Sequence, residues 1–202
     1  MNLIHKLGMV QSDTKASKIF ITLVDPDFRN TSFATPHEYV ETYWKAYKTA
    51  HPSATASLNG NMFEIIIKTL LYKEGVLPYY SQARAAFVPN INYDVLLYSK
   101  SEPVSLSLKT SLRERYKQAD LEAVALKYVH RKSECYLLTI DKNEASGASA
   151  KITSGDILGL NEIVYCFSDE LDNLISKLKS RIFSESEKVE VIEGALVKLV
   201  TP

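Results

Sequence analysis

The sequence predicts an α/β fold in which helices cover a mixed β-sheet. Short apolar or alternating runs are typical of strands, and longer runs with apolar residues three or four positions apart are typical of helices. These runs follow the order helix, three strands, helix, strand, strand, helix. A chain of 202 residues with 46% hydrophobic and 24% charged residues suits one soluble globular domain.

The first clear helix signal starts at Thr35. This residue suits the N-cap position, Pro36 suits the first helical position, and Glu38 stands three residues after the cap. We expect the helix to run to about His51, because Pro52 prevents its continuation. Its aromatic stripe is predicted to be a packing face, with base stacking or DNA contact as the alternative. The stripe consists of Tyr39, Tyr43, Trp44 and Tyr47.

The remaining elements follow from the same patterns. Helices are predicted at residues 59–74, 112–129 and 169–183, and strands at 79–88, 93–97, 104–109, 135–140 and 163–167, with a hairpin or strand at 189–200. Residues 53–57 and 143–159 are rich in small or polar residues and are predicted as loops. Residues 19–24 fit either a strand or a buried helical turn. We interpret residues 1–55 as a helical N-terminal extension packed on a single domain that spans residues 1–202.

Net charge and cysteine content restrict the classes of partner and compartment. The formal net charge is zero, which counts mildly against DNA binding, although local cationic clusters can still bind DNA. Cys135 and Cys166 lie far apart without metal-ligand spacing, which predicts buried free thiols in a reducing cytoplasm. The sequence has neither a signal peptide nor an apolar run of about eighteen residues, so secretion and a membrane partner are not expected.

Polar residues interrupt two of the predicted strands. Asp94 precedes the apolar run 95–97, where a carboxylate is costly unless it is paired or binds a metal. The alternative for Asp94 is a strand-end acid that faces solvent. In the next strand, Ser107 and Lys109 share one face because side chains alternate with a period of two. The alternative for Lys109 is an edge lysine that discourages strand pairing.

A second acid, Glu122, lies on the helix that follows. Arg115, Gln118 and Glu122 stand at positions i, i+3 and i+7, so they share a stripe at the border of the packed face. The Glu122 carboxylate can therefore reach towards the sheet, and the alternative is a solvated helix glutamate. Two acids on a strand and a helix, beside a lysine on the neighbouring strand, can hold a divalent metal next to a charged amine. This constellation is typical of phosphodiester hydrolysis.

These residues carry a resemblance to the PD-(D/E)XK nucleases, which include most type II restriction endonucleases. In that superfamily an acid is followed, after a gap, by acid–x–lysine; here Asp94 and Lys109 match, but Ser107 replaces the middle acid. Restriction enzymes that read CCGG- and CCNGG-type sites show the same departure, with the acid moved to the next helix. Ser107-Leu108-Lys109, twelve residues and then Glu122 resemble that shifted pattern. The match covers roughly residues 60–180, and Tyr93 stands where the motif has proline.

The resemblance implies a restriction-endonuclease-like three-layer α/β/α sandwich and a Mg²⁺ site. It assigns metal binding to Asp94 and Glu122 with the Leu108 carbonyl, and it assigns Lys109 to positioning the attacking water. Glu64 is a further candidate, because family members often place an acid on the helix before the first catalytic strand. The alternative for Glu64 is a solvated or helix-paired glutamate. Ser107 would be a spectator or would contact the metal through a water.

Cations at the start of the predicted helix 112–129 are candidates for DNA contact. The resemblance suggests that Arg113, Glu114 and Arg115 enter the major groove, where arginine contacts guanine and an acid accepts from cytosine. Lys117 extends this cluster. Glu114 could instead complete a capping box with Ser111. A second basic patch fits either DNA contact or a solvated helix C-terminus and contains Lys127, Tyr128, His130, Arg131 and Lys132.

The sequence thus predicts a cytoplasmic, Mg²⁺-dependent type II restriction endonuclease acting on double-stranded DNA. The resemblance implies 5′-phosphate and 3′-hydroxyl products, with the metal stabilising the leaving oxygen. Cutting both strands of a palindrome requires two sites, so we expect a homodimer, or a one-site subunit paired with a larger one. A cognate DNA methyltransferase is expected in the same system, though not as a stable partner. The alternatives are a repair or junction-resolving nuclease of the same superfamily, and a catalytically dead DNA-binding module.

Overall fold

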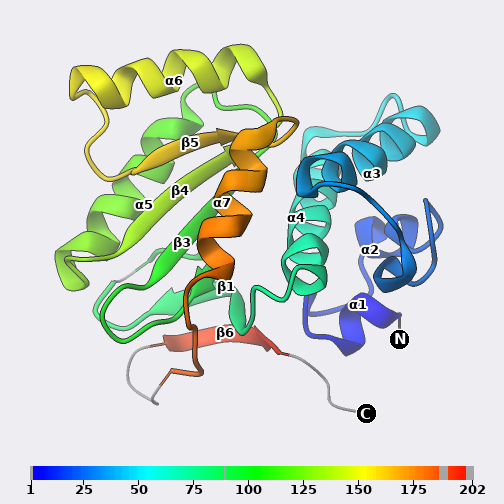
Figure 1. Cartoon of the computed structure of the whole chain (residues 1–202), viewed down its shortest axis with the longest axis horizontal. Coiled ribbons are helices and arrows are strands. Elements are labelled where there is room, and N and C mark those ends of the chain that lie inside the picture. The colour runs from blue at the N-terminus through cyan, green and yellow to red at the C-terminus, as the bar shows by residue number, and fades with distance from the viewer. Residues whose placement is uncertain (1, 89, 187–190, 199–202) are drawn as a thin grey trace.

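Six strands form one open, mixed sheet in the computed structural model, which describes residues 2–88, 90–186 and 191–198. The strand order is β5-β4-β3-β2-β1-β6 (Figure 1). The strands are β1 (Tyr79–Ala85), β2 (Tyr93–Leu97), β3 (Val104–Lys109), β4 (Glu134–Thr139), β5 (Glu162–Tyr165) and β6 (Val191–Val197). β6, β1, β2 and β3 pair antiparallel, whereas β3, β4 and β5 pair parallel. The predicted α/β class with a mixed sheet is confirmed.

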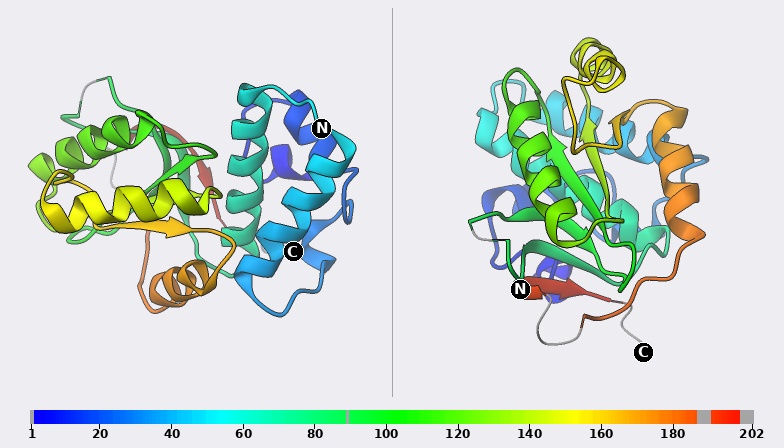
Figure 2. Two further views of the ribbon diagram at one scale, coloured as in Figure 1. Left: turned by 90° about the horizontal axis from the view of Figure 1, so that it is seen from above. Right: turned by 90° about the vertical axis from the view of Figure 1, so that its left-hand side faces the viewer.

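Helices cover both faces of this sheet because its strands are apolar on both sides. The helices are α1 (Leu3–Lys6), α2 (Lys15–Phe20), α3 (Pro36–Ala50), α4 (Ala56–Lys73), α5 (Arg115–Val129), α6 (Lys142–Ser154) and α7 (Asp169–Lys179), with a 3₁₀ turn at Phe28–Asn30. In β4, Cys135 and Leu137 pack with α5 and α6, while Tyr136 and Leu138 pack with α4 and α7. Figure 2 shows α5 and α7 on opposite faces. Such a layered arrangement is compatible with a three-layer sandwich.

The N-terminal helices lie on the side of α4 that faces away from the sheet (Figures 1 and 2). α4 is therefore buried on nearly all sides, which explains its long apolar run. The aromatic stripe of α3 is a packing face, as predicted: Tyr39, Tyr43 and Tyr47 are fully buried. Tyr39 Oη donates a 2.8 Å hydrogen bond to Thr69 Oγ1 of α4. Among the described residues, no helix has the length and apolar character needed to cross a lipid bilayer.

Most element boundaries agree with the sequence prediction, but the loop predicted at residues 143–159 is wrong. This segment contains α6, since alanine and serine tolerate a helix and the ends carry clear stop signals. Asp141 is the N-cap, and its Oδ1 accepts a 2.9 Å hydrogen bond from the Glu144 backbone N–H. Gly155 ends the helix with a φ of 83°. The predicted cysteine state is confirmed, because Cys135 and Cys166 are buried free thiols.

Other boundaries differ from the prediction as well: the helix predicted at residues 169–183 ends at Lys179, and the strand predicted at residues 163–167 ends at Tyr165. The loop predicted at residues 53–57 is shorter, because Thr55 caps α4 and the helix begins at Ala56. The helix predicted from residue 112 begins at Arg115. The strand predicted at residues 79–88 ends at Ala85. Residues 19–24 take the helical alternative in part, since α2 ends at Phe20, and of the segment 189–200 residues 191–197 form a strand, while 189, 190, 199 and 200 lie outside the described residues.

The loop before β5 is held tightly against α5. Asp120 Oδ1 accepts backbone N–H groups from Leu158, Gly159 and Leu160 at 3.1, 2.6 and 3.3 Å. A Cβ atom at Gly159 would lie 2.5 Å from the Asp120 carbonyl oxygen and 2.5 Å from the Val124 nitrogen. Only glycine fits this contact, because both neighbours are backbone atoms that cannot move aside.

We expect Gly159→Ala to lower the free energy of unfolding by about 2–3 kcal/mol, because the added methyl group meets backbone atoms. Urea denaturation measures this change. Gly147→Ala is the matched control: Gly147 lies inside α6, and the space that a Cβ atom would take there is open. This control should raise stability by about 0.5–1 kcal/mol, since alanine favours a helix more than glycine does. Equal stability of the two variants would contradict the close-contact interpretation.

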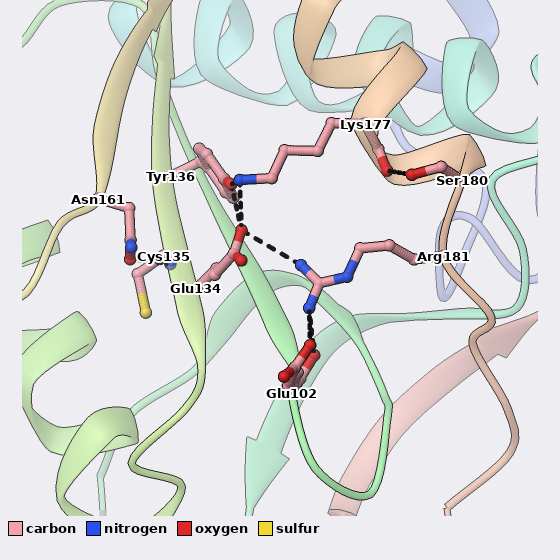
Figure 3. Close-up of polar contacts among 8 residues, drawn as sticks. All are labelled: Glu102, Glu134, Cys135, Tyr136, Asn161, Lys177, Ser180 and Arg181. Atoms are coloured by element: carbon pink, nitrogen blue, oxygen red, sulfur yellow. Dashed lines mark hydrogen bonds and ion pairs between the residues drawn. The ribbon is translucent and has the colours of Figure 1, made fainter.

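A polar network fastens α7 and the segment after it to β4 (Figure 3). Lys177 Nζ contacts Glu134 Oε2 at 2.9 Å and Tyr136 Oη at 2.7 Å. Arg181 bridges Glu134 at 3.2 Å and Glu102 at 3.1 Å. Burial raises the pKa of Glu134, but hydrogen bonds from Lys177 and Tyr136 and the charge of Arg181 outweigh burial, so its pKa lies below the usual value.

A lowered carboxyl pKa makes this network pH-dependent in a defined direction. The stabilisation is present above the ordinary glutamate pKa of about 4.5 and is lost as the pH falls through the lower pKa of the folded state. We therefore expect Glu134→Gln to reduce the melting temperature at pH 7. The difference from the unmodified protein should shrink below about pH 4.5. A difference that stays constant down to about pH 3 would show that the charge of Glu134 does not stabilise the fold.

Candidate functional site

Asp94 and Lys109 form a buried ion pair between β2 and β3. Lys109 Nζ and the Leu108 backbone N–H both donate to Asp94 Oδ2, each at 2.8 Å. Val95 lies opposite Leu106, which places Asp94 beside these residues of β3. The side chains of Asp94 and Lys109 are only 13% and 7% exposed. β3 is an interior strand, so the edge-lysine alternative for Lys109 is wrong, and burial excludes the solvent-facing alternative for Asp94.

Glu122 faces this ion pair from α5. Gln118 Nε2 donates a 2.7 Å hydrogen bond to Glu122 Oε1, and Tyr93 Oη of β2 donates to the Glu122 backbone carbonyl at 3.1 Å. Burial raises the pKa of Glu122. The negative charge of Asp94 also raises it, against the lowering effects of the Gln118 hydrogen bond and the Lys109 charge. The Glu122 side chain is half-buried and lines a cavity together with Asp94 and Ser107 of the sheet, so it is not fully solvated.

Asp94, Ser107 and Glu122 line a small cavity of about 10 Å³ between β2, β3 and α5. This is roughly the space of one water-sized sphere. The Ser107 Oγ atom is buried and has no hydrogen-bond partner among the described residues. A buried hydroxyl without a partner is costly, so an oxygen-binding guest in this cavity would satisfy it. The three predicted residues are thus brought to one position.

The donor atoms around the cavity are all oxygens, which suits Mg²⁺. Both hydrogen bonds to Asp94 go to Oδ2, so within the described ranges Oδ1 has no partner. The site holds two carboxylates and neutral oxygens: across residues 2–88, 90–186 and 191–198, no three His, Cys, Asp or Glu side chains gather into a metal-binding group. The Leu108 N–H is used by Asp94, and metal binding by its carbonyl stays a prediction.

Glu64 of α4 lines an adjoining cleft of about 530 Å³, which Asp94 and Lys109 also line. Its Oε2 accepts from Lys68 Nζ at 2.9 Å and from Gln82 Nε2 at 3.1 Å. The helix-paired alternative for Glu64 is thus what the structure shows. Glu64 nevertheless repeats the pattern of Asp94: a lysine holds one carboxylate oxygen, and the other has no hydrogen bond in the described part of the chain.

The sequence interpretation missed Lys68 and Gln82. Lys68 is only 3% exposed, and the signal that could have identified it is a lysine within the apolar run of residues 65–71. Gln82 has a φ of 52°, which is unusual for a residue other than glycine. It lies where the β1–β6 pairing shifts register between Ser81 and Arg84, and this bulge turns its amide towards α4.

Arg113 and Arg115 line the same cleft as Asp94 and Lys109. They are exposed, as are Glu114 and Lys117, which form an ion pair with each other. The capping-box alternative for Glu114 is wrong, because its side chain makes no cap hydrogen bond and the Ser111 hydroxyl donates to Glu144 of α6 instead. Lys117 and the second basic patch at residues 127–132 are not among the residues that line the cleft.

No protein-family model, curated protein or solved structure matches this chain.

The contribution of the Glu64–Lys68 pair to the stability of the fold can be measured. We expect Lys68→Met to lower the free energy of unfolding by about 3 kcal/mol, because it leaves a partly buried carboxylate without its cation. Glu64→Gln should cost at least as much, since it leaves a buried ammonium unpaired. The double variant should recover much of the loss in a double-mutant cycle measured by urea denaturation.

A matched control is the pair of Glu41 and the exposed Lys45, which has the same i, i+4 spacing on α3 and is more exposed than the pair of Glu64 and Lys68. Lys45→Met should cost less than about 0.5 kcal/mol, because water screens an exposed pair. If the two lysine substitutions cost the same, burial of Lys68 does not determine the strength of its pair.

Proposed function

We propose that this protein is a Mg²⁺-dependent endonuclease that hydrolyses phosphodiester bonds of double-stranded DNA at a short specific sequence, as type II restriction enzymes do. The observation that carries the proposal is the buried Asp94–Lys109 pair, whose carboxylate lines, together with Glu122, a cavity that one small ion would fill. The finer fold assignment, a restriction-endonuclease-like sandwich, belongs to the same proposal. The six-stranded mixed sheet with helices on both faces supports it.

Each residue has a role that follows from its position. Asp94 Oδ1 and Glu122 would hold Mg²⁺, and Ser107 Oγ, which lines the same cavity, would stand beside the ion. The Leu108 carbonyl and Glu64 would help from the adjoining cleft, which Asp94 also lines. The bound ion would supply a Lewis acid and a more acidic water. Lys109 Nζ, fixed by Asp94 Oδ2, would hold the attacking water and offset negative charge on the phosphoryl oxygens.

DNA recognition would come from the rim of the cleft. Arg113 and Arg115 are exposed there, and a guanidinium group can contact guanine O6 and N7 with two hydrogen bonds. Glu114 and Lys117 stand beside them on the same exposed turn. Because one such site would cut one strand, cleavage of both strands would need a homodimer or a larger partner subunit.

A second candidate is a DNA-binding module without catalysis. It is favoured by Ser107, which stands where nucleases of this kind usually have an acid, and by the two-carboxylate composition of the cavity. Metal binding separates the candidates, because only the nuclease needs Mg²⁺ or Mn²⁺ in the cavity.

Digestion of a sequenced plasmid with Mg²⁺ tests the proposal. We expect discrete fragments with 5′-phosphate ends, and end mapping should give one short sequence. Asp94→Asn and Lys109→Met should each lower the rate by at least about 10³-fold, because charge stabilisation at the phosphoryl group is lost. Asp169→Asn, an exposed acid of α7 on the other face of the sheet, is the control that should leave the rate unchanged.

The same samples separate the remaining alternatives. A smear of fragments would indicate a nonspecific nuclease. If the protein neither cleaves DNA nor binds Mn²⁺, it is the non-catalytic module. Calorimetric Mn²⁺ titration of Glu122→Gln and Glu64→Gln shows which acid completes the site. Unchanged Mn²⁺ affinity and unchanged cleavage in Glu122→Gln would exclude the helix acid as a ligand.

A further inference from the structure

The loop that carries the arginines is fastened from a distant part of the chain. The Glu144 carboxylate accepts from the Leu112 backbone N–H through Oε2 and from the Arg113 N–H and the Ser111 hydroxyl, each at 3.3 Å, through Oε1. Glu144 lies about thirty residues further along the chain, in the first turn of α6. No other described side chain accepts a hydrogen bond from these two backbone N–H groups.

The sheet topology explains why these segments meet. β3 and β4 are parallel neighbours, and their ends are aligned, since Lys109 lies opposite Thr139. The loops that leave the two strands therefore start at the same edge of the sheet. α6 is fixed there by the Asp141 cap and by Ala145 and Ala148, which are buried against the sheet. Glu144 thus projects from a rigid base.

The hold on the loop fixes an unusual backbone conformation. Arg113 has a φ of 34°, a value that side chains other than glycine rarely adopt, and such strain persists only where the surroundings enforce it. Two successive N–H groups and a hydroxyl around one carboxylate form a concave anion site. α5 has no side-chain cap of its own, and the N–H groups that Glu144 accepts belong to Leu112 and Arg113, in the loop that precedes the first helical residue, Arg115.

We propose that Glu144 is a positioning residue that sets sequence specificity by fixing where Arg113 and Arg115 stand relative to Asp94 and Lys109. The inference rests on the proposed function. Arg113 and Arg115 follow Lys109 by only four and six positions, so the conformation of this loop, together with the packing of α5 from Arg115 onwards, determines the offset between base contact and bond cleavage. Glu144 does not line the cavity or the cleft, so it acts through the loop.

Glu144→Gln tests this role, because a glutamine amide is neutral and has only one oxygen that accepts hydrogen bonds, whereas the carboxylate accepts three through two oxygens. We expect the ratio of kcat/KM for the mapped site to that for a duplex with one changed G·C pair to fall by about 10- to 100-fold. Calorimetric Mn²⁺ affinity should stay unchanged, as should cleavage of the changed duplex. Glu38→Gln is the matched control: Glu38 has the same place in the first turn of α3 and accepts one N–H, from Ala34.

Ser111→Ala provides a second variant that removes only one of the three hydrogen bonds, in case Glu144→Gln does not fold. It should lower the specificity ratio in the same direction by a smaller factor. The inference is overturned if neither variant changes the ratio while the unmodified protein cleaves specifically. It is also overturned if Glu144→Gln lowers Mn²⁺ affinity and all cleavage equally, which would show a merely structural role. Failure of the unmodified protein to bind Mn²⁺ or to cleave defeats the proposed function instead.

Discussion

The buried ion pair of Asp94 and Lys109 is the interaction on which the arrangement of the candidate site depends. Removing two charges from water costs several kcal/mol per ion, and a well-packed apolar pair would stabilise two neighbouring strands at least as well. The pair therefore has no evident stabilising advantage in the sheet interior. It does fix a positive nitrogen and a carboxylate oxygen side by side, and the neighbouring residues extend this arrangement. A functional reason explains the cost better than a structural one.

Strand pairing in the sheet changes from antiparallel to parallel at β3, the strand that carries Lys109. β3 pairs antiparallel with β2, which carries Asp94, and parallel with β4, which leads to α6. The antiparallel side supplies the acid, and the parallel side supplies two loops that leave the sheet at the same edge. α4 closes the other wall, and the N-terminal helices cover its outer side, so that it can carry the buried Lys68 beside Glu64. Residues of α4, of strands β2 and β3, and of the start of α5 thus line one cleft.

Patterns of short range were readable in the sequence, and contacts of long range were not. The strands 93–97 and 104–109 follow from alternation, and the face shared by Ser107 and Lys109 follows with them. α6 was missed because its alanines and serines look like a loop, although Asp141 and Glu144 have the spacing of a cap. The capping box predicted for Ser111 and Glu114 does not form, because the Ser111 hydroxyl donates to Glu144 instead. That contact depends on how β3 and β4 pair. The contact of Gln82 with Glu64 could not be predicted either, because it depends on a bulge in β1.

Charge balance in the cleft gives the last constraint. The chain as a whole has no net charge, so a polyanion would be attracted only by local cations. Around the cavity and cleft, the three carboxylates of Glu64, Asp94 and Glu122 face the two buried lysines, Lys68 and Lys109. A phosphodiester would be repelled from that centre, whereas a divalent cation would reverse its sign. The exposed arginines at the rim favour DNA binding both with and without the bound cation. On this reasoning, binding of DNA near the rim and entry of a phosphate into the centre are separate events, and only the second requires the metal.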